Sequence, residues 1–122
     1  MASAARRPSA LDTCFARMRD GRRTGLVTYV TAGDPNLERT PGILSALARG
    51  GADVVELGIP FSDPLADGPV IQRASERALT AGTTLGRALD MLKTVRRDVG
   101  LPIVVFTYAN PVLRLGLERF AA

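Results

Sequence analysis

Three short segments of this chain are apolar and rich in β-branched residues, and each is followed by turn-forming residues. They span 26–31, 53–61 and 101–107. The middle segment is apolar at nearly every position except Glu56, a pattern typical of a parallel strand that is covered on both faces. Between the segments, apolar residues recur at helical spacing. This alternation predicts an α/β fold with a parallel sheet and right-handed crossovers.

Capping signals predict where the helices begin and end. The predicted starts are Ser9, Thr40-Pro41, Pro69 and Thr83-Thr84. Residues 108–111 contain a proline and an asparagine and are predicted to form a turn that closes the third strand, before a weak helix over 113–122.

The domain organisation follows from the number of strands. We expect residues 1–8 to form a flexible tail and residues 9–122 to belong to one domain. Three strands are too few for a complete doubly wound sheet, and a (β/α)₈ barrel typically needs about 250 residues. We therefore expect the first three βα units of an incomplete TIM barrel.

Composition excludes several classes of function. The chain has no histidine and one cysteine, so an internal disulfide is impossible and acid/base chemistry must use carboxylates, tyrosine or lysine. The net charge is +4, but the basic residues are scattered, which favours solvated helix faces over nucleic-acid binding. The sequence contains neither nucleotide-binding glycine motif and no apolar run of a membrane span, and we expect no bound cofactor or metal.

Candidate chemistry lies at the strand exits, because parallel α/β folds bind ligands at the carboxyl ends of their strands. The exit over 62–68 is the most polar. Burial of Glu56 within its strand would favour the protonated form and suit it to proton transfer, although a structural glutamate paired with lysine or arginine would have the same position. Asp67 follows in the exit loop and could place a second carboxylate beside the same ligand, or could simply form the turn.

The run from Glu56 to Gln72, Glu-Leu-Gly-Ile-Pro-Phe-Ser-Asp-Pro-Leu-Ala-Asp-Gly-Pro-Val-Ile-Gln, closely resembles the signature of tryptophan synthase alpha subunits. Residues 29–35, Tyr-Val-Thr-Ala-Gly-Asp-Pro, and residues 108–110, Tyr-Ala-Asn, support the resemblance. It extends over essentially the whole chain after the N-terminal tail.

The resemblance implies a cytoplasmic lyase of L-tryptophan biosynthesis. This family cleaves indole-3-glycerol phosphate by a retro-aldol reaction to indole and glyceraldehyde 3-phosphate. Its partner is a beta subunit that carries pyridoxal phosphate, in an alpha2beta2 heterotetramer. By resemblance, Glu56 is the general acid/base that protonates the indole ring carbon, and Asp67 accepts the indole N–H.

Further roles follow from the same resemblance. Tyr29, Phe106 and Tyr108 match residues that line the indole pocket, although ordinary packing at strand ends is an alternative. Asp63 matches the loop that contacts the beta subunit.

Two other functions stay open. The family's later strands and phosphate-binding loops lie beyond the part that this sequence matches, so the chain could be an inactive partial barrel that only binds a beta subunit or another partner. It could also belong to a related barrel enzyme with a different phosphate-bearing substrate, but the run from Glu56 to Gln72 argues against this.

Overall fold

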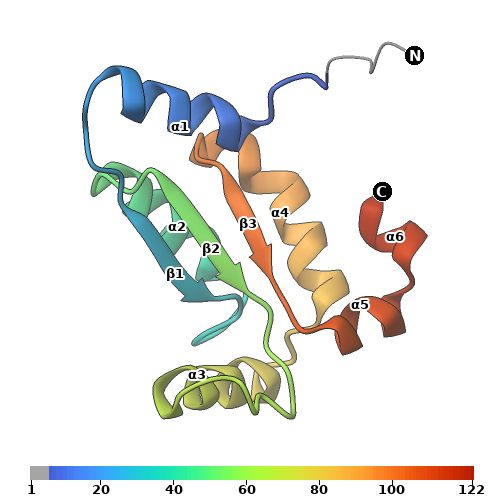
Figure 1. Ribbon diagram of the computed structural model, residues 1–122. Helices are drawn as coiled ribbons and strands as arrows, with labels where there is room; N and C mark the ends of the chain where they lie inside the picture. The colour runs from blue at the N-terminus through green and yellow to red at the C-terminus, as the bar shows by residue number, and fades with distance from the viewer. Residues whose placement is uncertain (1–5) are drawn as a thin grey trace.

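A computed structural model describes residues 6–122 and contains a three-stranded parallel sheet (Figure 1). The strands are β1 (Val27–Thr31), β2 (Val54–Gly58) and β3 (Ile103–Phe106), in the order β1-β2-β3. Each strand lies inside its predicted segment, and both neighbouring pairs are parallel. The predicted α/β class and parallel sheet are therefore confirmed.

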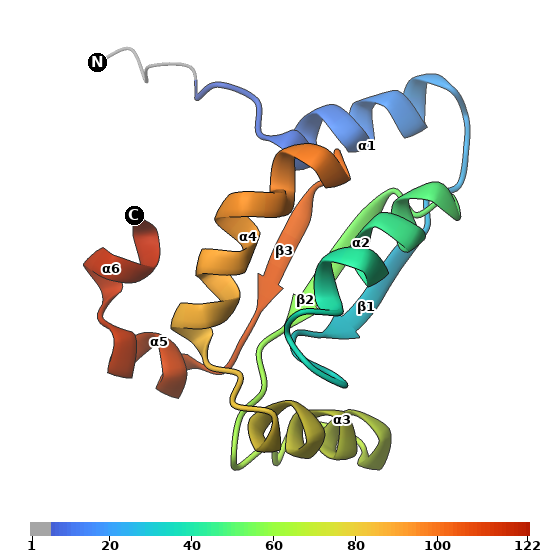
Figure 2. The ribbon, with the colours of Figure 1, turned by 180° about the vertical axis from the view of Figure 1, so that it is seen from behind.

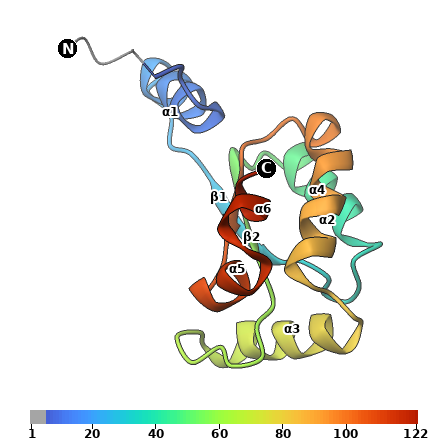
Figure 3. The ribbon, with the colours of Figure 1, turned by 90° about the vertical axis from the view of Figure 1, so that its right-hand side faces the viewer.

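The helices lie on one face of the sheet and at both of its ends. They are α1 (Ala10–Asp20), α2 (Thr40–Arg49), α3 (Pro69–Thr80), α4 (Leu85–Val99), α5 (Ala109–Leu115) and α6 (Leu117–Ala121). Helices α2 and α4 pack against one face, α1 lies at the amino ends of the strands, and α3 crosses beyond their carboxyl ends (Figures 2 and 3). Within residues 6–122, no helix has both the length and the apolar character needed to cross a membrane.

Two of the predicted helix starts are confirmed by side-chain caps. The Ser9 hydroxyl accepts a hydrogen bond from the backbone N–H of Asp12 (3.1 Å), and the Asp12 carboxylate accepts one from the backbone N–H of Ser9 (2.7 Å). The Thr84 hydroxyl caps α4 by accepting from the N–H of Arg87 (3.2 Å). Helix α4 ends at Val99, and the following residue, Gly100, caps it in the left-handed conformation (φ 70°) that glycine favours.

Two other local predictions were wrong. Thr40 is the first helical residue of α2 rather than its cap, and its buried hydroxyl accepts a hydrogen bond from the N–H of Gly33 (3.0 Å) and donates one to the carbonyl of Asn36 (3.3 Å). The predicted turn at 108–111 instead contains the first turn of α5. Pro111 is tolerated there because N–H groups in the first turn of a helix have no intrahelical partner.

The tail predicted over 1–8 can be compared with the structure only in part. Residues 1–5 lie outside the described residues, and residues 6–8 are exposed and belong to no helix or strand. The domain bounds of 9–122 stay a prediction.

The two faces of the sheet differ. The face covered by α2 and α4 carries one apolar core, whose buried members are Ala32, Leu44, Val55, Leu57, Ile59, Leu85, Ala88, Leu92 and Val99. On the other face, Tyr29, Glu56 and Val104 lie in register across the strands. This face is open toward the carboxyl end of β3, where Phe106 is 51% exposed, whereas Val54 near its amino end is 2% exposed.

Strand β2 is buried at four of its five residues, as its apolar pattern predicted. Val54 and Gly58, which lie two residues before and after Glu56 on the same face, are both buried, and Glu56 itself is half-buried.

Asp53 ties the start of β2 to the segment before β1. Its carboxylate accepts hydrogen bonds from the backbone N–H of Leu26 (2.8 Å) and from both terminal nitrogens of Arg23, one at 3.0 Å. The hydrogen-bonded Arg23 guanidinium, followed by the Leu26 amide, lowers the pKa of Asp53 from 3.8 to about 2.

Core packing against the sheet can be tested at Leu57, which is completely buried. Leu57→Ala should lower the free energy of unfolding by about 2–5 kcal/mol, because it removes buried apolar volume between the sheet and α4. Leu113→Ala is the matched control, since Leu113 is 66% exposed and should change stability by roughly 0.5 kcal/mol or less. Urea unfolding followed by circular dichroism measures both, and equal effects would contradict this core.

The Asp53 interaction predicts a pH dependence. Because the folded state depresses the pKa of Asp53, its contribution to stability is complete above the unfolded value of 3.8 and is lost as the pH falls through about 2. Asp53→Asn should therefore reduce the loss of stability between about pH 5 and pH 2. Urea midpoints across this range test it, with Asp90→Asn on the exposed surface of α4 as control. Identical pH profiles for wild type and Asp53→Asn would refute the assignment.

Candidate active site

The carboxyl ends of the three strands are held together by backbone hydrogen bonds that continue beyond the strands. The N–H of Ala32 donates to the carbonyl of Gly58 (2.8 Å), and the N–H of Ile59 donates to the carbonyl of Phe106 (2.9 Å). The exit segments of β1, β2 and β3 therefore lie side by side, as the sequence predicted for a parallel sheet.

Asp67 and Tyr108 meet at this end of the sheet although 41 residues separate them. The Tyr108 hydroxyl donates to Oδ2 of Asp67 (3.1 Å) and accepts a hydrogen bond from the N–H of Ala66 (3.0 Å). The Gln72 side-chain amide donates to the carbonyls of Asp67 (2.8 Å) and Pro64 (3.2 Å). The loop after β2 is thus fastened to both β3 and α3, and the Asp67 carboxylate has a defined position.

Aromatic rings flank this carboxylate. The Phe61 ring packs on Tyr108 with centroids 5.0 Å apart and planes at 34°, while Tyr29 meets Phe106 edge to face at 5.9 Å and 86°. Tyr29 lies over Gly58, where an added Cβ would overlap the phenol ring. Gly58 is therefore the residue that allows Tyr29 to lie across the sheet.

Glu56 lies beside Tyr29 in the sheet register. Its side chain forms no hydrogen bond or ion pair within residues 6–122, so the alternative of a structural glutamate paired with arginine or lysine has no support in the described part of the chain. Burial raises the pKa of Tyr29, a hydrogen bond with Thr31 opposes this, and the negative charges of Asp67 and Glu56 raise it further.

Tyr108 experiences a similar environment. Burial raises its pKa, the Ala66 amide opposes this, and the hydrogen bond that it donates to Asp67 raises the pKa again. At neutral pH both tyrosines are consequently neutral, and Tyr108 stays a donor to Asp67.

Asp63 lies at an exposed position of the loop after β2, and its side chain forms no hydrogen bond or ion pair with the other site residues in the described structure, although its charge helps to raise the pKa of Tyr108. The backbone there is turned by a hydrogen bond from the N–H of Leu65 to the carbonyl of Asp63 (2.9 Å), and Leu65 is 83% exposed. Asp63 is therefore exposed beside the site without a hydrogen bond to Glu56 or Asp67.

Sequence reasoning missed an ion pair that supports the site. The Arg77 guanidinium on α3 binds both oxygens of Asp34 after β1, at 2.8 Å each, and this hydrogen bonding lowers the pKa of Asp34. No local pattern relates residues 43 positions apart. Phe61 and Gln72 were also not singled out, although an aromatic residue at a strand exit is a detectable signal for the first.

The arrangement provides two carboxylates, two phenols and a flat apolar surface at the carboxyl end of a parallel sheet. Within residues 6–122, no cluster of acidic or cysteine side chains has the geometry of a metal site. The groups present can transfer protons and can accept a hydrogen bond from the N–H of an aromatic ligand.

Sequence comparison identifies the family. A family model described as tryptophan synthase alpha chain matches residues 15–122. The chain belongs to this family. Among curated relatives, the tryptophan synthase alpha chain of Geobacter sulfurreducens is 57% identical over 108 residues, and that of Solibacter usitatus is 55% identical over 108 residues. Each alignment covers 88% of this chain, but only 41% and 40% of the respective relative.

Solved structures agree with the sequence relatives. The tryptophan synthase alpha subunit of Legionella pneumophila superposes with a TM-score of 0.88 at 42% identity, covering 92% of this chain and 43% of that one. Tryptophan synthase of M. tuberculosis gives 0.86 at 38% identity, covering 93% and 45%. The expected fold is thereby confirmed, because the three βα units correspond to part of a TIM barrel, and the chain spans about two fifths of its relatives' length.

Removal of the Tyr108 hydroxyl tests how the Asp67 loop is held. Tyr108→Phe should accelerate hydrogen exchange at the Ala66 amide about fivefold, because one hydrogen bond contributes on the order of 1 kcal/mol. Tyr29→Phe is the matched control and should leave this exchange rate unchanged, since the Ala66 amide binds Tyr108. Unchanged exchange in Tyr108→Phe would contradict the contact.

Proposed function

We propose that this chain supplies the catalytic carboxylates for the retro-aldol cleavage of indole-3-glycerol phosphate to indole and glyceraldehyde 3-phosphate. The observation that carries the proposal is the placement of two carboxylates at the carboxyl ends of the strands, with Glu56 beside Tyr29 in the sheet and Asp67 held by Tyr108. Family membership supports the same reaction, which makes the protein a lyase of tryptophan biosynthesis.

Glu56 acts as the general acid and base. It delivers a proton to the indole carbon that bears the glycerol phosphate chain, so that this carbon can leave when the carbon–carbon bond breaks. A carboxylate then takes the proton of the adjacent glycerol hydroxyl, whose oxygen becomes the aldehyde oxygen of glyceraldehyde 3-phosphate. Glu56 suits this role because no lysine or arginine of the described residues engages its carboxyl group.

Asp67 stabilises the cationic ring that forms after protonation. Its carboxylate accepts the indole N–H and offsets the developing positive charge. The hydrogen bond from Tyr108 keeps the carboxylate oriented, since a fixed acceptor needs little reorganisation during the reaction. The rings of Tyr29, Phe106 and Tyr108 provide the flat apolar surface for indole.

The proposed partner is a tryptophan synthase beta subunit with pyridoxal phosphate, in an alpha2beta2 assembly in the cytoplasm. Asp63 is the proposed contact, supported by its position at an exposed loop tip beside the highly exposed Leu65. We take residues 9–122 as a single domain that contributes this part of the barrel. We propose that this chain itself needs no cofactor.

A second candidate is a chain that binds the beta subunit without cleaving substrate. The exposed segment around Asp63 favours it, because Asp63 and Leu65 are exposed and their side chains form no hydrogen bond with Glu56 or Asp67. Both candidates are distinguished in one assay, since cleavage releases indole whereas binding alone stimulates only the beta reaction.

The decisive measurement is indole release from indole-3-glycerol phosphate by this chain, with and without a beta subunit. Glu56→Gln should reduce the rate at least about 100-fold, because it removes the transferable proton but preserves shape. Glu38→Gln, at an exposed position between β1 and α2, is the matched control and should retain activity. Equal turnover in Glu56→Gln would refute its role, and stimulation of the beta reaction without indole release would favour the binding function.

A further inference from the structure

The loop after β2 ends in a tight turn over residues 64–67. The N–H of Asp67 donates to the carbonyl of Pro64 (3.0 Å), which is the bond that closes a β-turn. Asp67 directly precedes Gly68, the N-cap of α3, and Gly68 accepts the first hydrogen bond of the helix from the N–H of Gln72 (3.0 Å). The carbonyl of Asp67 therefore lies just outside the helix and needs a donor other than the helix backbone.

The side chain of Gln72 supplies this donor. Its Nε2 donates to the carbonyl of Asp67 (2.8 Å) and to the carbonyl of Pro64 (3.2 Å), which are the two ends of the turn. In the part of the chain that the structure describes, no backbone N–H donates to the Asp67 carbonyl. Gln72 is half-buried, so its loss would leave a partly buried carbonyl without a protein partner.

Tyr108 holds the same turn through different atoms. Its hydroxyl accepts from the N–H of Ala66 and donates to the carboxylate of Asp67. Gln72 thus binds the backbone of the residue whose side chain Tyr108 binds. Because the rotamers open to a side chain depend on its backbone dihedrals, a change of the turn would redirect the Asp67 carboxylate.

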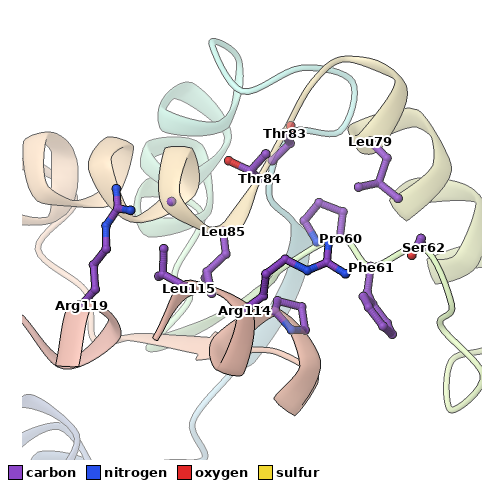
Figure 4. A pocket seen from close by; sticks show the side chains of 12 residues that line it. Pro60, Phe61, Ser62, Leu79, Thr83, Thr84, Leu85, Arg114, Leu115 and Arg119 are labelled. Carbon is purple, nitrogen blue, oxygen red and sulfur yellow. The ribbon is translucent and has the colours of Figure 1, made fainter. Parts of the chain in front are cut away.

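Helix α3 is a fixed support for these contacts. The two hydrogen bonds between Arg77 and Asp34 join it to the segment after β1. The start of the loop contacts a different region, since Phe61 faces a groove bordered by α3, α4 and α5 (Figure 4), and neither Gln72 nor Asp67 lines that groove. The turn over 64–67 therefore depends on Gln72 for its hydrogen bonds to α3.

We propose that Gln72 is a positioning residue, which holds both carbonyls of the turn and thereby directs the Asp67 carboxylate. This role rests on the proposed function, in which that carboxylate accepts the indole N–H. Glutamine suits the position because one amide nitrogen carries two N–H donors. In Gln72→Glu the ionised side chain keeps its shape but has no donor, and in Gln72→Met it has neither a donor nor a charge.

Hydrogen exchange measures the turn without substrate. Gln72→Glu and Gln72→Met should each accelerate exchange at the Asp67 amide about tenfold or more, because opening the turn no longer breaks two side-chain hydrogen bonds. Arg73→Gln, exposed on the same helix, makes the same charge change as Gln72→Glu and should leave this rate unchanged. The Ala32 amide, which donates to Gly58, reports general loosening of the sheet. Unchanged exchange at Asp67, or equal acceleration at Ala32, would overturn the proposal.

Tyrosine emission measures the direction of the carboxylate. The chain has two tyrosines and no tryptophan, so Tyr29→Phe leaves Tyr108 as the single fluorophore. A carboxylate that accepts a hydrogen bond from a phenol quenches its emission. In this background Gln72→Met and Asp67→Asn should each raise the emission, and combining them should add little, because both act on one contact. No increase in Gln72→Met, or an equal increase when Asp67 is already asparagine, would overturn the positioning role.

The catalytic consequence is measured by indole release. Gln72→Met should lower kcat about tenfold, since a misdirected carboxylate stabilises the transition state less, whereas Arg73→Gln should retain kcat. Accelerated exchange and raised emission with unchanged kcat would overturn the role of Gln72 in the reaction. Absence of turnover in the wild type would instead contradict the proposed function and would leave the exchange and emission results intact, so the two failures are distinguishable.

Discussion

The central strand β2 is hydrogen-bonded on both sides, to β1 and to β3, and these backbone bonds continue into the exit segments through Ala32 and Ile59. Because parallel strands share one direction, this pairing aligns three carboxyl ends that lie far apart in the sequence. The loop after β2 can then be fastened to the residue that follows β3. Without the sheet register, the hydrogen bond between Tyr108 and Asp67 could not form.

The two faces of the sheet have different roles: one carries the apolar core, and the other carries the candidate catalytic residues. Residues that alternate toward α2 and α4 form the apolar core, while those on the opposite face include Tyr29, Glu56 and Phe106. In a (β/α)₈ barrel the face away from the helices lines the interior, and ligands bind at its carboxyl end. Glu56 is half-buried on this face, whereas Leu57 on the helix-covered face is completely buried.

Much of the fold could be predicted from local patterns. The three strands, the Ser9 capping box and the Thr84 cap agree with expectation, because strand preference and caps depend on nearby residues. The errors have a common cause. Thr40 forms hydrogen bonds with Gly33 and Asn36 that a search for caps does not reveal, and the turn residues at 108–111 can also form the first turn of a helix.

The sequence by itself determined the α/β class, the family resemblance, and Glu56 and Asp67 as the carboxylates to examine. Periodicity and strand-exit position carry that information, and both are properties of the chain's order. Only the tertiary structure decided that Tyr108 orients Asp67, that Arg77 binds Asp34, and that Phe61 packs on Tyr108. These contacts arise when the sheet brings distant segments together, and a local pattern cannot specify which side chains then meet.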